Sequence, residues 1–167
     1  MSRVRDVMAG FQEFAEPRDG IRNGPFRLAS TLQEPASEHE ILAAWRNRQL
    51  PEDLVELWTT CREARLFEDI DYGQWGLHVL SPVESANRTA MERDARSTDI
   101  GPNDVVFGEF LGDQELLVRT PGDRDDGVLV ALPLDRKSDW HRAGRDIAEF
   151  LERYLASAGE KYWESTA

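Results

Sequence analysis

Residues 104–120 decide the fold, and their sequence is Asp-Val-Val-Phe-Gly-Glu-Phe-Leu-Gly-Asp-Gln-Glu-Leu-Leu-Val-Arg-Thr. Two apolar runs, 105–111 and 116–118, flank a turn centred on Asp113, which is the pattern of a β-hairpin. A third apolar run, 128–132, follows a polar loop that contains glycine and proline. The links are too short for parallel crossovers, which need a dozen or more residues, so the sequence predicts an antiparallel meander.

A second hairpin is predicted before this stretch, because residues 66–80 contain two short apolar runs around an acidic turn. Ser81, Pro82 and Glu84 follow with the spacing of a capped helix start. A serine at the cap and a glutamate three residues later each satisfy a backbone amide there. We therefore expect a helix from Pro82 to about Ala95.

Apolar residues recur at helical spacing near both ends of the chain. The N-terminal stripe predicts a helix that lasts to about Ala15 and packs on the domain, with engagement of a partner as the alternative. The C-terminal stripe predicts a helix that closes the sheet. The two stripes are Val4, Val7, Met8, Phe11 and Phe14, and Ile147, Phe150, Leu151, Tyr154 and Leu155.

Two further helices are expected between residues 37 and 61. The first begins with the capping-box spacing of Ser37 and Glu40, and its inner face is expected to hold Ile41, Leu42 and Trp45. Pro51 suits the first position of the second helix, since the amide that it lacks would have no partner there. The apolar stripe of that helix is Leu54, Leu57, Trp58 and Cys61. This stripe predicts a buried structural thiol at Cys61 and not a nucleophile.

Helices that precede and follow a run of strands indicate an α+β fold. A chain of 167 residues suffices for one ordinary core, so a single domain is expected. We expect a central antiparallel sheet flanked by N-terminal and C-terminal helices. In this prediction residues 1–29 form the N-terminal helix and a linker, and residues 30–160 form the α+β domain.

The chain is strongly acidic, with 32 Asp and Glu against 20 Lys and Arg and a formal net charge of −12 at pH 7. Nucleic acid and anionic membrane surfaces would on average be repelled, so neither is an expected partner. A basic protein is the electrostatically favoured partner. The alternative is that the charge only keeps the chain soluble.

Cysteine usage and hydropathy indicate the compartment. Cys61 is the only cysteine, which excludes an internal disulfide and a cysteine-based zinc cluster and fits a reducing environment. The first residues lack the apolar run of a signal peptide, and no stretch approaches the roughly 18 apolar residues that span a bilayer. We therefore expect a cytoplasmic protein.

Motifs for catalysis or cofactor binding do not occur in the sequence. His39, His78 and His141 are the only histidines and lack metal-ligand spacing, so no metal site is expected. Glycine-rich phosphate-binding motifs and the Gly-x-Ser-x-Gly elbow are also absent, and no cofactor is expected. Carboxylates could meet at one edge of the sheet, but 32 acidic residues make chance pairs common. No catalytic residue is assigned, and the chain is not expected to be an enzyme.

The two hairpin turns hold the candidate residues for binding a partner. Tyr72 and Trp75 lie in a turn rich in Asp and Gly, where a large ring costs solubility unless it packs or contacts something. Packing within the domain is the alternative for both rings. Carboxylates in the two turns could steer a basic partner. The candidate partner-binding residues are Asp69, Asp71, Tyr72, Trp75, Asp113 and Glu115.

Several of these patterns, taken in order, resemble the SUKH superfamily. The resemblance runs from about residue 30 to 156 and rests on five segments, which are residues 50–58, 76–84, 104–113, 127–133 and 146–155. It departs at the end of the helix that begins with Leu50 and Pro51. Family members often carry Asn-Gly there, whereas this chain has Cys61-Arg-Glu-Ala-Arg65, so a different shape is expected for the helix end and the adjoining turn.

Members of this superfamily include fungal regulators of cell-wall assembly and bacterial immunity proteins that neutralise the toxin domains of polymorphic toxin systems. The resemblance implies a single α+β domain that binds a protein and catalyses nothing. We expect an immunity protein that offers carboxylates and aromatic rings to the basic cleft of a cognate toxin, often a nuclease in such systems. The alternative is a regulatory or scaffold module that docks onto a cellular protein. The sequence does not indicate an oligomeric state.

Overall fold

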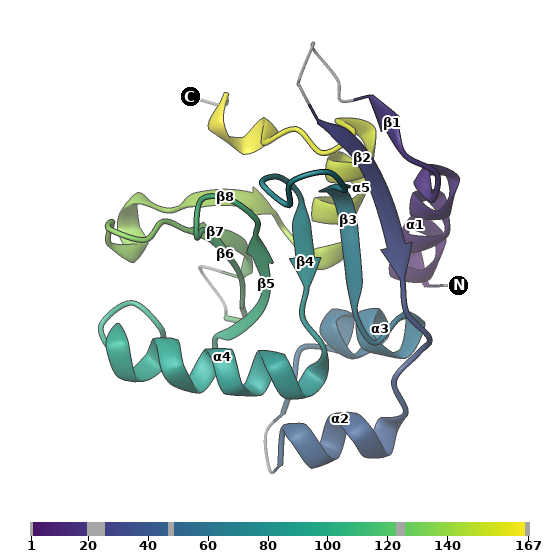
Figure 1. Cartoon of the computed structure of the whole chain (residues 1–167). Coiled ribbons are helices and arrows are strands. Elements are labelled where there is room, and N and C mark those ends of the chain that lie inside the picture. The colour runs from purple at the N-terminus through teal and green to yellow at the C-terminus, as the bar shows by residue number, and fades with distance from the viewer. Residues whose placement is uncertain (1, 20–25, 47–48, 123–125, 166–167) are drawn as a thin grey trace.

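The computed structural model describes residues 2–19, 26–46, 49–122 and 126–165. Within them the chain has an α+β fold with one antiparallel sheet, as the sequence predicts (Figure 1). Of the linker expected before residue 30, residues 20–25 lie outside the described part, whereas residues 18–19 and 27–29 belong to strands. The helices are α1 Arg3–Phe11, α2 Glu38–Ala44, α3 Glu52–Thr60, α4 Pro82–Ala95 and α5 Ile147–Ala156. The strands are β1 Arg18–Asp19, β2 Arg27–Leu32, β3 Ala64–Asp69, β4 Leu77–Val79, β5 Val105–Phe110, β6 Leu116–Thr120, β7 Gly127–Ala131 and β8 His141–Gly144.

The strands pair in sequence order from β1 to β8, and every described pairing is antiparallel. The predicted hairpin of β3 and β4 and the predicted meander of β5 to β7 are confirmed. Strands β1 and β2 extend one edge and β8 extends the other, and the apolar pattern predicts none of these three. Strand β2 buries Leu28, Ala29 and Ser30 in succession, so it lacks the alternation that marks a half-buried strand.

One face of the sheet carries the larger core, covered by α1, α3 and α5 (Figure 1). Helix α1 buries Val4, Val7, Met8 and Phe11, so the expected packing of the first helix on the domain is observed. Phe14, the last residue of the predicted stripe, follows α1 in a short 3₁₀ helix and packs partly buried against the same core. Trp58 is fully buried in α3 and donates from Nε1 to the Leu80 carbonyl at 2.9 Å. Phe150 and Tyr154 of α5 stack within the same core.

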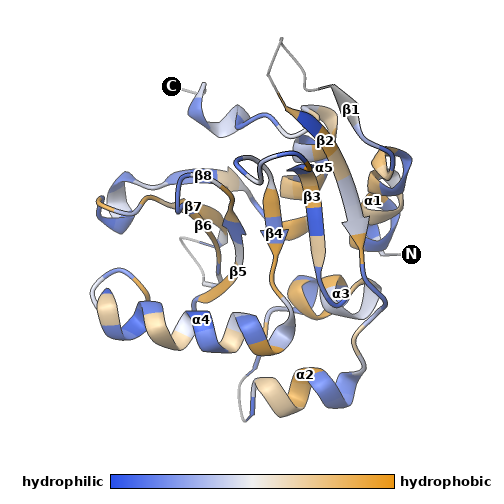
Figure 2. Cartoon of the chain, viewed as in Figure 1, coloured by the Kyte–Doolittle hydropathy of each residue, from blue (hydrophilic) through white to orange (hydrophobic). Residues whose placement is uncertain are grey.

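A second, smaller core lies on the other face of the sheet, beside α4. Neighbouring residues of a strand point to opposite faces; thus Val105 belongs to the larger core and Val106 to the smaller one. In Figure 2, β4 carries apolar residues on either side of a polar one, and α4 alternates between polar and apolar residues. The smaller core comprises Leu80, Ile100, Val106, Leu116, Val118, Ala131 and Trp140.

Helix starts follow the expected capping chemistry, with corrections in α2 and α3. Pro51 has the extended ψ of 139° and is the cap residue before α3, not its first helical residue. Ser81 and Glu84 form the complete capping box at the start of α4. Ser37 accepts from the Glu40 amide as expected, but the Glu40 carboxylate pairs with Arg62 and does not return to the cap. Leu42 was also assigned wrongly to the inner face of this helix, because its side chain is 63% exposed.

The end of α3 forms without a glycine. Cys61 takes an extended conformation with φ −150° and ψ 136° as its amide closes the helix on the Leu57 carbonyl. The backbone therefore leaves the helix directly toward β3, and no left-handed residue is required at this position. Cys61 itself is fully buried, as predicted.

The C-terminal segment after α5 returns to the sheet and the core. Residues Tyr162–Glu164 form a short 3₁₀ helix that buries the ring of Trp163. The Tyr162 hydroxyl donates to the Ala143 carbonyl at 2.6 Å. The described helices include none with both the length and the apolar character needed to cross a bilayer.

Candidate functional site

The turns that follow β3 and β5 lie side by side and form what we call the hairpin-end surface, residues 69–76 and 111–115. The Leu111 amide donates to the Gly76 carbonyl at 2.9 Å, which joins the two turns. Gly112 has a left-handed φ of +97°, and a Cβ at this position would lie 2.2 Å from the Gln74 carbonyl oxygen. Only glycine permits this close approach. All six candidate partner-binding residues therefore lie at one end of the sheet.

Asp69 holds the first turn together and is not available to a partner. Its side chain is buried at 1% exposure, and its carboxylate accepts from the amides of Asp71, Tyr72 and Gln74 at 3.0–3.1 Å. The assignment of Asp69 to a contact surface is corrected accordingly. Its role is that of an Asx-type turn, in which a carboxylate substitutes for missing backbone acceptors.

Asp71 is exposed but already has a basic partner within the chain. Arg27 of β2 makes two hydrogen bonds to its carboxylate, at 2.8 and 3.1 Å. The guanidinium lowers the pKa of Asp71 through these bonds. This exposed pair contributes little to stability, although it reduces the charge that Asp71 can offer to another molecule.

Lys161 occupies the space between the other two carboxylates of the hairpin-end surface. Its Nζ contacts Asp113 and lies 2.8 Å from Glu115 Oε1. The same Nζ lies 5.3 Å from the centre of the Trp75 ring, a cation–π distance. Lys161 is only 9% exposed at its side chain, and burial raises the pKa of Glu115. The sequence did not indicate Lys161, because it lies more than 45 residues from either carboxylate.

The two aromatic residues of the first turn have different environments. Trp75 is half-buried and donates from Nε1 to the Gly159 carbonyl at 3.1 Å, so packing accounts for this ring. Tyr72 is 72% exposed, and Ile70 beside it is 41% exposed. Of the six candidates, Tyr72 is therefore the residue that presents a large uncovered side chain to solvent.

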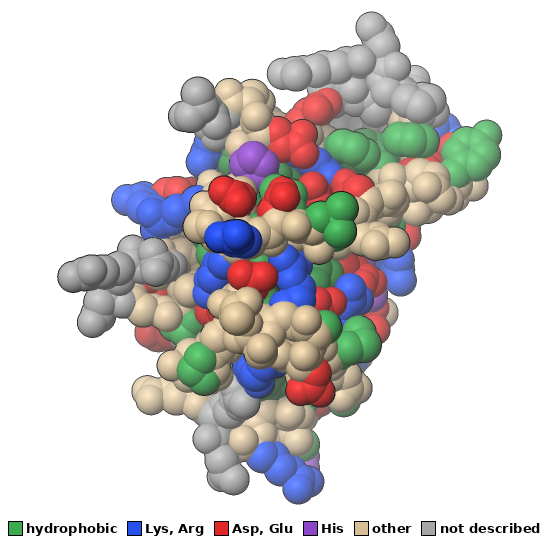
Figure 3. All heavy atoms as spheres, turned by 90° about the vertical axis from the view of Figure 1, so that its left-hand side faces the viewer, with side chains coloured by type: hydrophobic (Ala, Val, Ile, Leu, Met, Phe, Trp, Pro, Cys, Tyr) green, Lys and Arg blue, Asp and Glu red, His purple; other side chains and the backbone are tan. Residues whose placement is uncertain are grey.

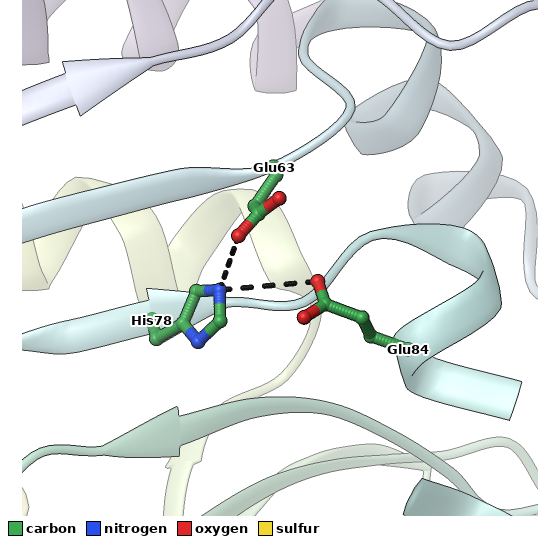
Figure 4. A group of neighbouring side chains, drawn as sticks. All are labelled: Glu63, His78 and Glu84. Atoms are coloured by element: carbon green, nitrogen blue, oxygen red, sulfur yellow. Dashed lines mark hydrogen bonds and ion pairs between the residues drawn. The ribbon is translucent and has the colours of Figure 1, made fainter. Parts of the chain in front are cut away.

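At the opposite end of β3 and β4 lies a cluster that sequence spacing did not indicate: Glu63, His78 and Glu84 (Figure 4). Glu63 precedes β3, His78 is central in β4, and Glu84 lies in the first turn of α4. The His78 Nε2 atom lies 2.6 Å from Glu63 Oε2 and 3.9 Å from Glu84 Oε1. The imidazole is 6% exposed, whereas Glu84 is 43% exposed. One ligand atom from each residue lies within 4.8 Å of the other two.

A chain of polar contacts leads from the second nitrogen of His78 to α4. His78 Nδ1 lies 3.1 Å from Glu109 Oε1, and Arg88 donates to the other oxygen of Glu109 at 3.0 Å. Arg88 also binds Glu92 on its own helix. These contacts fix the orientation of the His78 ring.

Beyond Glu109, a groove of about 610 Å³ lies between α4 and the β5–β6 hairpin. Figure 3 shows the side of the molecule on which α4 and the segment after β7 lie, and there acidic and basic side chains alternate without a large patch of either sign. The groove is lined by Arg88, Glu92, Arg96, Glu109, Phe110, Leu111, Gly112, Gln114, Leu116 and Pro133. Its mixed lining does not favour one class of ligand.

Three environments for acidic residues thus coexist on the sheet: a turn organised by a buried carboxylate, a surface neutralised in part by Lys161, and a histidine cluster. The first is structural, and the other two are the candidate functional sites. Comparison with protein-family models and with curated proteins gives no match to this chain.

Proposed function

We propose that this chain is a protein-binding module of the SUKH type that neutralises a cognate toxin by binding it directly. The observation that carries the proposal is the exposure of Tyr72 at 72%, next to Ile70, on a surface bordered by carboxylates. Tyrosine is favoured at the centre of interfaces, since its ring offers a large apolar area and its hydroxyl a polar contact. The order of the SUKH-like sequence segments supports the same proposal.

The charge of the hairpin-end surface suits a basic partner even after internal pairing. Lys161 supplies one positive charge, against the carboxylates of Asp113, Glu115 and Glu164 around it. The balance remains negative, and the whole chain carries −12. Such a field raises the rate at which a basic cleft, such as that of a nuclease, encounters the surface.

The test uses the protein encoded beside the gene for this chain, with binding kinetics measured on a surface. Tyr72→Ala should raise the dissociation rate by about 30-fold, the equivalent of an anchoring ring worth about 2 kcal/mol. Leu134→Ala is the matched control, because Leu134 is 97% exposed and lies outside the hairpin-end surface. Equal dissociation rates for the Tyr72 variant and the wild type would refute the anchoring role.

Charge variants test the steering component separately. The triple variant Asp113→Asn, Glu115→Gln, Glu164→Gln should slow association and flatten its dependence on salt, since rim charges act mainly on the on-rate. Added salt should mimic the substitutions because the Debye length shrinks from about 10 Å at 0.1 M to about 3 Å at 1 M. An on-rate that responds neither to salt nor to these substitutions would refute electrostatic steering, and the negative charge would then serve only to keep the chain soluble. A partner that binds without losing activity would favour the regulatory or scaffold alternative.

A further inference from the structure

The cluster of Glu63, His78 and Glu84 brings together side chains of the types that bind transition metals. They come from three different elements, so their convergence depends on the fold and not on a local motif. Neutral imidazole and carboxylate oxygen are both common ligands of divalent transition metals. The partial exposure of Glu84 leaves a route by which an ion can reach the buried His78 Nε2 from solvent.

A second observation is the contact on the far side of the imidazole ring. His78 Nδ1 faces Glu109 Oε1 at 3.1 Å, and Arg88 fixes the same carboxylate. Metal-binding histidines almost always donate their other ring N–H to a carboxylate or carbonyl, which sets the tautomer and turns the free nitrogen toward the metal. The Glu109 contact therefore prepares Nε2 to act as a ligand.

The balance of charge also favours a cation at Nε2. A neutral imidazole has one N–H, so it can donate to Glu109 or to Glu63, but not to both. The nearby Arg62 already makes a bidentate pair with Glu40, at 2.7 and 3.0 Å. A divalent ion placed between Nε2, Glu63 and Glu84 would satisfy both carboxylates, and the Nε2 proton, where present, would leave to solvent.

From this geometry we propose that Glu63, His78 and Glu84 bind one divalent transition metal ion, with Zn²⁺ preferred. Two ligand atoms about 2.0–2.1 Å from a tetrahedral zinc lie about 3.3 Å apart. The Nε2 separations of 2.6 and 3.9 Å lie on either side of this value, so small rotations of the two glutamates complete the site. Three protein ligands leave a fourth position for water or for another ligand. The inference goes beyond the proposed function and does not depend on it.

The experiment is calorimetric titration of the full chain with zinc chloride after treatment with a chelator. Wild-type protein should bind one equivalent of Zn²⁺ and should melt several degrees higher with excess zinc, since an ion that binds only the folded state stabilises it. Ca²⁺ should give no saturable binding because it requires six to eight oxygen ligands. Glu63→Gln and His78→Gln should each abolish the one-equivalent site. Glu109→Gln should weaken it by about 10–100-fold, as expected for a group that orients a ligand.

The matched control is the double variant His39→Gln, His141→Gln, which retains His78 and removes the other two histidines of the chain. It should bind zinc as the wild type does. Glu84→Gln is the variant least damaging to folding, because its amide oxygen can still accept from the Ser81 amide in the helix cap, and it should weaken binding at least tenfold. Circular dichroism checks the fold of each variant. No saturable binding to the wild type, full binding to Glu63→Gln and Glu84→Gln, or loss of binding in the double histidine variant would each overturn the proposal.

Discussion

Phe150→Ala removes a ring that is completely buried at the centre of the larger core. The ring stacks on Tyr154 at a centroid distance of 5.6 Å and contacts Trp163 at 6.0 Å. Burial of a phenylalanine side chain stabilises a fold by about 1.5–3 kcal/mol, and each aromatic pair adds about 0.5–1.5 kcal/mol. With the cavity that remains, the expected loss of unfolding free energy is about 3–5 kcal/mol, a large part of a small domain's stability.

Equilibrium unfolding in urea, followed by far-UV circular dichroism, measures this loss. The slope of the free energy against urea should stay constant, which shows that the native and unfolded states expose the same surface as before. Leu134→Ala is the control, because a side chain that is 97% exposed should change the stability by less than about 0.5 kcal/mol. A loss below about 1 kcal/mol for Phe150→Ala would show that α5 does not close the core, and the packing argument would fail.

Two further predictions concern Asp69 and Cys61. Asp69→Ala leaves three backbone amides of the first turn without their acceptor, so urea unfolding should show a loss of about 2–3 kcal/mol, whereas Asp71→Ala should cost under about 1 kcal/mol. Burial raises the pKa of Cys61 from its ordinary value of 9.0 to about 12; the unfolded chain therefore loses its thiol proton first as the pH rises, and stability falls from pH 9 to 12. Between pH 8 and pH 10 the unfolding free energy of the wild type should fall by about 1.4 kcal/mol more than that of Cys61→Ala. An equal fall in both proteins would contradict the burial of the thiol.

The central part of the fold could be predicted because its periodicities are long and regular. The stripes of α1, α3 and α5 and the apolar runs of β5 to β7 bury most of the residues expected of them. The exceptions are partly buried residues, most of them near the ends of these elements, namely Phe14, Leu111, Leu129, Leu132 and Leu155. The strands at the two edges of the sheet, β1, β2 and β8, have no regular apolar pattern in the sequence. Strand β8 reads His-Arg-Ala-Gly, which lacks the β-branched and aromatic residues that mark strands, and it pairs because β7 presents a free edge beside it.

The location of the hairpin-end surface could be predicted, but the state of its charges could not. Strand order and turn length place Tyr72 and Asp113 at the same end of the sheet. The different roles of Asp69 and Asp71 had a local sequence signal, since an aspartate followed by turn residues often accepts hydrogen bonds from the amides two and three positions later. The pairing of Lys161 with Glu115 had none, because it depends on the path of the chain after α5.

The histidine cluster and the hairpin-end surface can be tested independently, because they lie at opposite ends of the β3–β4 hairpin. In the sheet His78 pairs with Arg65, and four residues separate Arg65 from Asp69 along the strand, which corresponds to about 13 Å. This exceeds the Debye length of about 10 Å at 0.1 M salt, and Tyr72 follows Asp69 in the turn, so a charge added at His78 is largely screened at Tyr72. Substitutions at such distances have additive effects unless a shared element moves. Zinc binding and partner binding therefore probe two separate properties of one sheet, and the failure of either would leave the argument for the other unchanged.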